Sequence, residues 1–190
     1  MDLWWWVIGA LLLVALLWVA WTFNQLVRRR NGVDESWATI GVELKRRHDL
    51  IPSIVDTVRG YAGFEQSVLT RIAESRSRAV GAPGGADAQA ETSLTDSIRS
   101  LFAVAEAYPD LKATEQFQSL QQQLALTEDR IAYARAVYNA WVTDYETSRQ
   151  SFPASLIAGL FRFDRRAFFE ADVASRGEVD VSLRGDAASA

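Results

Sequence analysis

The segment WWWVIGALLLVALLWVAWTF, residues 4–23, decides the fold because it holds no charged side chain and Thr22 is its clearly polar residue. A helix rises about 1.5 Å per residue, so about twenty residues span about 30 Å, the hydrocarbon thickness of a bilayer. Tryptophans stand near both ends, where indole rings favour the headgroup boundary. The segment predicts a transmembrane signal anchor over residues 1–23.

A cleaved signal peptide is the alternative interpretation of this N-terminus. Such a peptide has a basic start, an apolar stretch of about 7 to 15 residues and a small-residue cleavage site. The chain opens on Met-Asp-Leu and its apolar stretch is longer. The uncleaved anchor is therefore favoured.

Arg28, Arg29 and Arg30 follow the apolar segment, whereas the N-terminal flank carries Asp2 and no basic residue. Basic flanks stay in the cytoplasm, so these three arginines are the expected determinants of topology. They predict a single-pass protein with its N-terminus outside and its C-terminal domain in the cytoplasm. A lipid-binding polybasic patch usually has more basic residues, about four to eight.

The composition excludes several classes of function. A net charge of −4 argues against nucleic-acid binding, which needs a concentrated basic face. Lys45, Arg46 and Arg47 have acidic neighbours, which predicts a solvated, mixed-charge helix face. The chain has no cysteine, so it forms no disulfide and performs no thiol chemistry.

Apolar residues recur every seven residues beyond the anchor, from Trp37 to Val58, with Arg47 interrupting the companion row. Pro52 lies inside this register and permits two interpretations: a new helix starting at Pro52, or one long, kinked helix. Because the register passes through the proline, we expect one helix from the anchor to about Val80.

Two further helices are expected after the segment GAPGGAD, residues 81–87, which predicts a chain reversal. The first ends before Pro109. The second starts near Leu111, carries a seven-residue stripe from Phe117 to Tyr145, and ends at Phe152-Pro153. The predicted fold class is all-α: the transmembrane helix followed by an antiparallel up-and-down bundle of three or four long helices, residues 24–152.

Aromatic and basic residues alternate after the bundle, in a predicted amphipathic segment over residues 153–170. So many apolar rings need a partner, which is the end of the same bundle, an anionic bilayer surface or a second protomer. Residues 171–190 are rich in Ala, Ser, Gly and Asp and predict a flexible tail. The candidate interaction residues are Phe152, Phe161, Phe163, Phe168, Phe169, Arg162, Arg165 and Arg166.

Four motifs in this order resemble the LemA family of bacterial membrane proteins, with the similarity running over residues 24–163: LKRRHDLIPSIVDTVRGYAGFE from Leu44, YPDLKA from Tyr108, LQQQLALTEDRIAYARAVYN from Leu120 and SFPASLIAG from Ser151. The resemblance implies a signal anchor in the bacterial inner membrane and a cytoplasmic helical bundle. Family members often carry histidine where Phe64 stands, so no function of that histidine is expected here.

The residues for common chemistries are scarce. His48 is the single histidine, so one chain can build neither a zinc site nor a di-iron bundle. We expect His48 to face solvent, and we predict no catalytic residue, cofactor or metal. Asn139, Thr127 and Ser148 stand within the apolar stripes and either fix the helix register or solvate the bundle edge.

The predicted function is that of a scaffold or adaptor, not an enzyme, acting by protein–protein interaction at the cytoplasmic membrane face. Its expected partners are the lipid bilayer and proteins of unknown identity, with a second copy of the chain as a further candidate; nucleic acid is not expected. One alternative is an oligomeric membrane-shaping coat. The alternative from another class is a lipid- or protein-modifying enzyme, which should hold a concave pocket with convergent polar groups.

Overall fold

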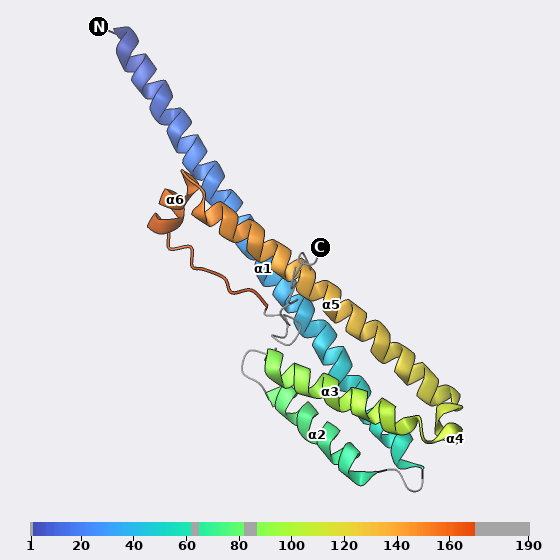
Figure 1. Ribbon diagram of the computed structural model, residues 1–190. Helices are drawn as coiled ribbons and strands as arrows, with labels where there is room; N and C mark the ends of the chain where they lie inside the picture. The colour runs from blue at the N-terminus through green and yellow to red at the C-terminus, as the bar shows by residue number, and fades with distance from the viewer. Residues whose placement is uncertain (1, 62–64, 82–86, 170–190) are drawn as a thin grey trace, which may run out of the picture.

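The described part of the chain consists of helices with short segments between them, as the computed structural model shows (Figure 1). It describes residues 2–61, 65–81 and 87–169. Within these ranges every regular element is helical, which confirms the all-α prediction. The elements are α1 (Asp2–Arg59), α2 (Gln66–Gly81), α3 (Ala88–Ala105), α4 (Pro109–Lys112), α5 (Glu115–Gln150) and α6 (Ala154–Leu160).

The four longest helices form an antiparallel bundle, as the sequence predicts. Helix α5 packs along α1, and α2 packs along α3. Figure 1 shows the α2–α3 pair at the end of α1 remote from the N-terminus. Helix α6 contacts both α1 and α5 at the opposite end of the bundle.

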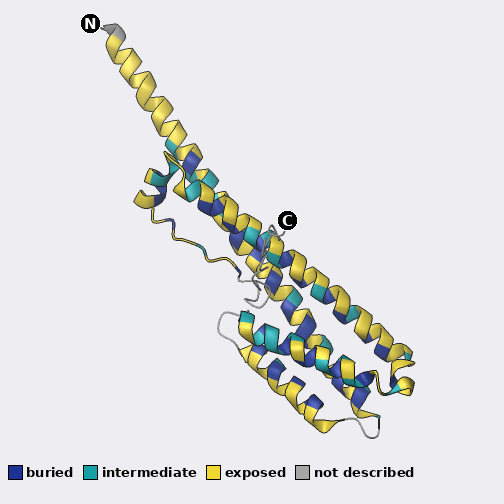
Figure 2. Cartoon of the chain, viewed as in Figure 1, coloured by how far each residue is buried: buried dark blue, intermediate teal, exposed yellow. Residues whose placement is uncertain are grey.

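The first part of α1 stands clear of the bundle (Figure 2). Its most apolar 18-residue window has a mean hydropathy of 2.2 and contributes almost nothing to the core. Trp4 is 76% exposed and Leu16 is 67% exposed. Among the described helices α1 is the one long and apolar enough to cross a bilayer, as expected of the predicted anchor.

Both seven-residue stripes are packing surfaces, and they build two apolar cores. We call the first the membrane-proximal core; it joins α1, α5 and α6 through Leu26, Val33, Ile40, Leu44, Ile131, Ala134, Tyr138, Val142, Tyr145 and Ile157. We call the second the distal core; it joins the end of α1 to α2, α3, α4 and the start of α5 through residues that include Ile51, Val58, Ile72, Leu94, Leu101, Leu111, Phe117 and Leu124.

The prediction of one long helix from the anchor to about Val80 is correct in one part and wrong in the other. Helix α1 continues across Pro52, whose ring is exposed, but it ends at Arg59 and does not reach Val80. Gly60 follows at once, and the Tyr61 amide donates to the Val58 carbonyl at 3.0 Å. Glycine is the residue most often found just past a helix end, so the sequence contained this signal.

The start of α5 also differs from the expected Leu111. A single turn, α4, begins at Pro109, and α5 begins at Glu115. The Thr114 hydroxyl caps α5 by accepting from the Phe117 amide at 3.4 Å. A threonine cap of this kind fixes a helix start, so the stripe alone placed it too early.

Two glycines of α1 make a matched pair for mutation. A methyl group on Gly32 would lie 2.7 Å from the Trp141 ring of α5, whereas one on Gly41 meets no atom within 4 Å. Inside a helix, alanine is favoured over glycine by about 0.5–1 kcal/mol. We therefore expect Gly41→Ala to raise the melting temperature and Gly32→Ala to lower it. Equal stabilisation by both would contradict the close α1–α5 contact.

Candidate membrane-proximal site

The apolar segment of α1 meets the bundle at Trp18, Trp21 and Phe23. Trp18 and Trp21 remain 37% and 57% exposed, whereas Phe23 is half-buried. The Phe23 ring contacts Phe161 and Phe163 edge-on, with centroid distances of 4.9 and 5.6 Å. The end of the apolar segment therefore coincides with the beginning of the packed bundle.

A groove of about 450 Å³ lies at this junction. Trp18, Trp21 and Thr22 line it from α1, and the turn that joins α5 to α6 lines it from the other side. The buried Thr22 hydroxyl has no hydrogen-bond partner among the described residues. The groove thus combines indole surfaces with a small number of polar atoms at the level where the predicted membrane ends.

The predicted topology determinants lie one to two helical turns beyond Phe23. Arg28 is exposed. Arg29 donates to the Asp144 carbonyl at 3.0 Å and pairs with the Asp144 carboxylate at 3.2 Å. The Arg30 guanidinium lies 5.6 Å from the Phe163 ring centroid. Two of the three arginines therefore also tie α1 to the bundle, and their role in topology stays a prediction.

Residues 163–169 form no regular element and run back along the bundle, and we call them the return segment (Figure 1). Tyrosine hydroxyls of α5 hold its backbone. Tyr145 donates to the Asp164 carbonyl and Tyr138 to the Ala167 carbonyl, both at 2.8 Å. The rings of these two tyrosines pack in the apolar stripe, and their hydroxyls donate hydrogen bonds to the return segment.

Asn139 pairs with the backbone of the return segment twice. Its amide nitrogen donates to the Phe169 carbonyl at 3.2 Å, and its oxygen accepts from the Phe169 amide at 2.9 Å. Of the two interpretations of the polar stripe residues, Asn139 therefore fits register fixing, between α5 and the return segment. Thr127 and Ser148 instead donate to carbonyls of their own helix, both at 2.8 Å.

The predicted interaction rings divide into two groups. Phe163 and Phe169 are both 6% exposed and belong to the membrane-proximal core. Phe152, Phe161 and Phe168 are 80%, 50% and 47% exposed. The first group packs against the bundle, and the second leaves apolar surface uncovered by the described chain.

The predicted interaction arginines divide in the same way. Arg166 pairs with Asp34 of α1 at 2.8 Å, and its amide donates to the Glu146 carboxylate at 2.8 Å. Arg162 and Arg165 are exposed and have no ion-pair partner among the described residues. Free cations therefore lie beside the uncovered rings.

A polar layer built around the buried side chains of Arg47, His48 and Glu91 lies between the membrane-proximal core and the distal core. Arg47 of α1, 1% exposed, forms a buried ion pair with Glu91 of α3 and reaches Glu128 of α5 at 2.8 Å. Arg47 also donates to the Thr95 hydroxyl at 3.0 Å, and His48 contacts Glu91 at 3.0 Å. We call these five residues the polar layer; it ties together three helices.

Two expectations about this region are wrong. His48 is 7% exposed and does not face solvent, and Arg47 is not part of a solvated helix face. Both side chains point into the bundle because Glu91, on a helix that starts about forty residues later, offers them a carboxylate. Lys45 and Arg46 remain exposed, as expected of a solvated face.

Opposing effects act on the pKa of Glu91. Burial raises it, but the hydrogen bond with His48 and the charge of Arg47 outweigh burial, and the net pKa lies below its ordinary value of 4.5. Burial also raises the pKa of Glu146, and the Arg149 and Arg166 hydrogen bonds bring it below 4.5. Both carboxylates are therefore charged in the folded protein at neutral pH.

These lowered pKa values predict acid sensitivity. A carboxylate with a lowered folded-state pKa contributes stability that is complete above its unfolded pKa and is lost as the pH falls through the folded value. The free energy of unfolding should therefore decrease on acidification below about pH 4.5. Denaturant titrations across this range should show a shallower pH dependence for Glu91→Gln. An unchanged dependence would mean that folding does not lower the pKa of Glu91.

Metal-binding groups do not assemble in the described ranges: no cluster of three His, Asp or Glu side chains is placed to hold an ion. Phe64 lies outside the described residues, as does the predicted tail over residues 171–190.

These elements define a membrane-associated helical bundle carried on a single apolar N-terminal helix. The chain belongs to the LemA family, whose model matches residues 36–183. This match confirms the resemblance inferred from the four motifs.

Three curated proteins illustrate the similarity. Protein LemA of Metamycoplasma hominis is 29% identical over 161 residues, which covers 84% of this chain and 74% of that protein. The magnetosome proteins MamQ 1 and MamQ 2 of Paramagnetospirillum magneticum are each 23% identical over 175 residues, which covers 78% of this chain and 64% of theirs.

Proposed function

We propose that this protein is a scaffold or adaptor that acts by protein–protein interaction at the cytoplasmic face of the bacterial inner membrane. One observation carries the proposal: α1 runs without a break from the exposed apolar segment into both cores. A bundle joined to its anchor by a continuous helix is held at a fixed height and angle relative to that anchor, because no flexible linker intervenes. This rigid connection suits a protein that presents a long helical surface to its partners.

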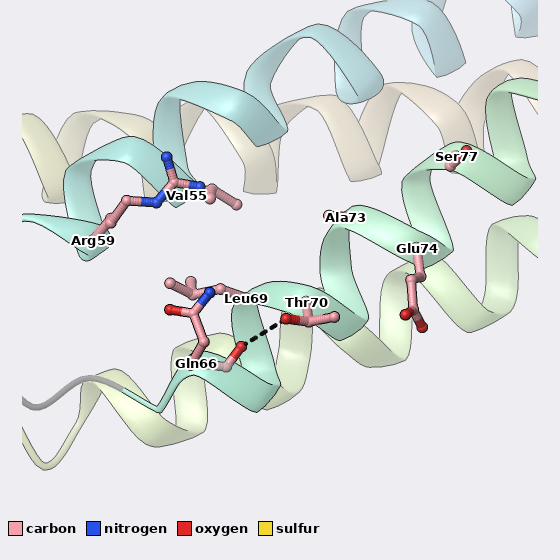
Figure 3. A pocket seen from close by; sticks show the side chains of 8 residues that line it. All are labelled: Val55, Arg59, Gln66, Leu69, Thr70, Ala73, Glu74 and Ser77. Carbon is pink, nitrogen blue, oxygen red and sulfur yellow. Dashed lines mark hydrogen bonds between the residues drawn. The ribbon is translucent and has the colours of Figure 1, made fainter.

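The grooves of the bundle give less support to an enzyme. The groove between α1 and α2, about 390 Å³, is lined by Val55, Arg59, Gln66, Leu69, Thr70, Ala73, Glu74 and Ser77. Figure 3 shows Glu74 at one end and Arg59 at the other, and the Thr70 hydroxyl bonds to the carbonyl of Gln66 in its own helix at 3.0 Å. The polar groups therefore do not converge on a common point, as an active site requires.

Co-isolation from native membranes tests the scaffold proposal. The full chain is extracted in polymer-bounded membrane discs, and the protein composition and particle mass are measured. If the protein is a scaffold, a protein of different sequence should be isolated with it in a stoichiometric amount. A large particle of this chain alone favours the membrane-shaping coat. A particle with one 21.2 kDa chain and no other protein would contradict both.

The orientation of the bundle is tested by a reporter fused after Ala190. Because Arg28, Arg29 and Arg30 lie on one flank only, the reporter should be active in the cytoplasm, and protease added outside should leave the bundle intact. Moving the three arginines to the N-terminal flank should reduce or invert this orientation. As the matched control, Arg71, Arg76 and Arg78 of α2 are replaced by glutamine and should leave it unchanged. An exported reporter in the unaltered chain would overturn the cytoplasmic placement.

A further inference from the structure

An apolar face of α6 is left open beside the end of the membrane anchor. Leu156 and Leu160 are 66% and 77% exposed, and Phe152 in the preceding turn is 80% exposed. Leu156 and Leu160 are four residues apart, so they share one face of the helix. Ile157 and Ala158 are 5% and 4% exposed and attach α6 to the membrane-proximal core. Helix α6 is thus apolar both toward the bundle and away from it.

The position of this face relative to the anchor identifies what covers it. Phe161 directly follows α6, and its ring centroid lies 4.9 Å from that of Phe23, the last residue of the apolar segment. Phe152 lines the same groove as Trp18 and Trp21. The headgroup zone of a bilayer is about 5–7 Å thick on each side of the hydrocarbon. If residues 4–23 span the hydrocarbon, α6 lies within this zone.

The charges next to this face match an anionic lipid surface. Arg162 and Arg165 follow α6, are exposed and have no ion-pair partner among the described residues, and Arg28 is exposed on α1. Apolar rings and leucines beside free arginines are the composition of helices that lie in the membrane interface. A soluble protein partner would require neither the position of α6 at the headgroup zone nor the exposed arginines beside it.

We propose that α6 is a second membrane contact, which inserts Phe152, Leu156 and Leu160 into the interface of the bilayer that the anchor spans. Arg162 and Arg165 bind lipid phosphates there. The proposal rests on the anchor spanning the membrane, as in the proposed function, and adds that the bundle is fixed to the bilayer at two points. This second contact restrains tilting of α1 and the bundle, as one body, relative to the bilayer.

Spin labels at single cysteines test this contact, because the chain has no native cysteine. Leu160→Cys reports α6 and Leu12→Cys reports the anchor. Tyr133→Cys, at a position 73% exposed in the middle of α5, reports the water-facing bundle. The full-length variants are placed in vesicles that contain phosphatidylglycerol, and collisions with oxygen and with a water-soluble nickel chelate are measured. Circular dichroism confirms that each variant is folded.

The oxygen-to-nickel collision ratio at Leu160 should be several-fold above that at Tyr133 and below that at Leu12. A Leu160 ratio equal to that at Tyr133, with Leu12 in lipid, would overturn the second contact and leave the anchor intact. A Leu12 ratio typical of water would overturn both. Strong coupling between Leu160 labels on different chains at high lipid content would also overturn the lipid contact, because a second copy then covers the face.

Charge reversal tests the arginines separately. Arg162→Glu with Arg165→Glu should bring the Leu160 ratio toward that of Tyr133, and Arg130→Glu, at an exposed arginine of α5, should leave it unchanged. A Leu160 ratio that does not respond to the double substitution would remove phosphate binding from the proposal.

Discussion

Replacing Glu91 by alanine is expected to lower the free energy of unfolding by about 3–5 kcal/mol, the usual effect of removing one partner of a buried ion pair. Glu91 is fully buried and is the shared partner of Arg47 and His48. Its removal leaves the Arg47 guanidinium in the bundle with only Glu128 as a charged partner. Denaturant unfolding of the full chain in lipid nanodiscs, followed by circular dichroism, measures the loss.

An exposed ion pair on the same helix provides the control. Asp96 pairs with Arg99 at 3.0 Å on the surface of α3, where solvent screens the attraction. Asp96→Ala should therefore leave the unfolding midpoint almost unchanged. Equal effects of Glu91→Ala and Asp96→Ala would show that the polar layer is not buried as described.

The second large effect is expected from the stripe of α5. Leu124→Ala and Ile131→Ala should each cost about 2–5 kcal/mol, because each removes buried methyl groups and leaves a cavity. Leu124 is 2% exposed in the distal core, and Ile131 is 1% exposed in the membrane-proximal core. The same unfolding measurement applies, and it compares the two cores on either side of the polar layer.

Leu126 is the matched control for both substitutions. It lies on the same helix but is 50% exposed, so Leu126→Ala should change the unfolding free energy far less. An unchanged midpoint for Leu124→Ala would mean that this stripe faces solvent, and the bundle would then be wrong.

The sequence was sufficient to predict the anchor and the stripes because both depend on local pattern. Residues 4–23 need only length and the lack of charge, and Leu44, Ile51 and Val58 need only helical spacing. The structure buries these three stripe residues to 2% exposure or less. Helix ends were less well predicted, since Gly60 and Thr114 act through backbone geometry that the stripes do not contain.

The polar layer was not predicted because its partners are far apart in the sequence. Arg47 and His48 have acidic neighbours in the sequence that look like sufficient partners for them. Their actual partner, Glu91, is separated from them by α2. The visible signal was the interruption of the apolar row at Arg47. A charged residue at a core position needs a buried partner, so this interruption already called for a carboxylate on a facing helix.

The return segment was anticipated in composition but not in path. The sequence indicated that the rings after Pro153 need cover, and the structure buries Phe163 and Phe169 while exposing Phe161 and Phe168. The path depends on backbone hydrogen bonds from side chains such as Asn139, which carry no periodic pattern. Only tertiary structure brings these groups together.

The scaffold proposal requires α1 to be one rigid helix from the membrane into the bundle, and a distance measured between two spin labels checks this. Gly9→Cys and Gly41→Cys are suitable sites because side chains added there meet no atom within 4 Å. An unbroken helix places the two backbones about 48 Å apart, at about 1.5 Å per residue. In full-length protein in lipid nanodiscs, a rigid α1 should give a narrow distance distribution near this value. A broad distribution centred at clearly shorter distances would contradict it, because the anchor and the bundle would then be joined by a hinge.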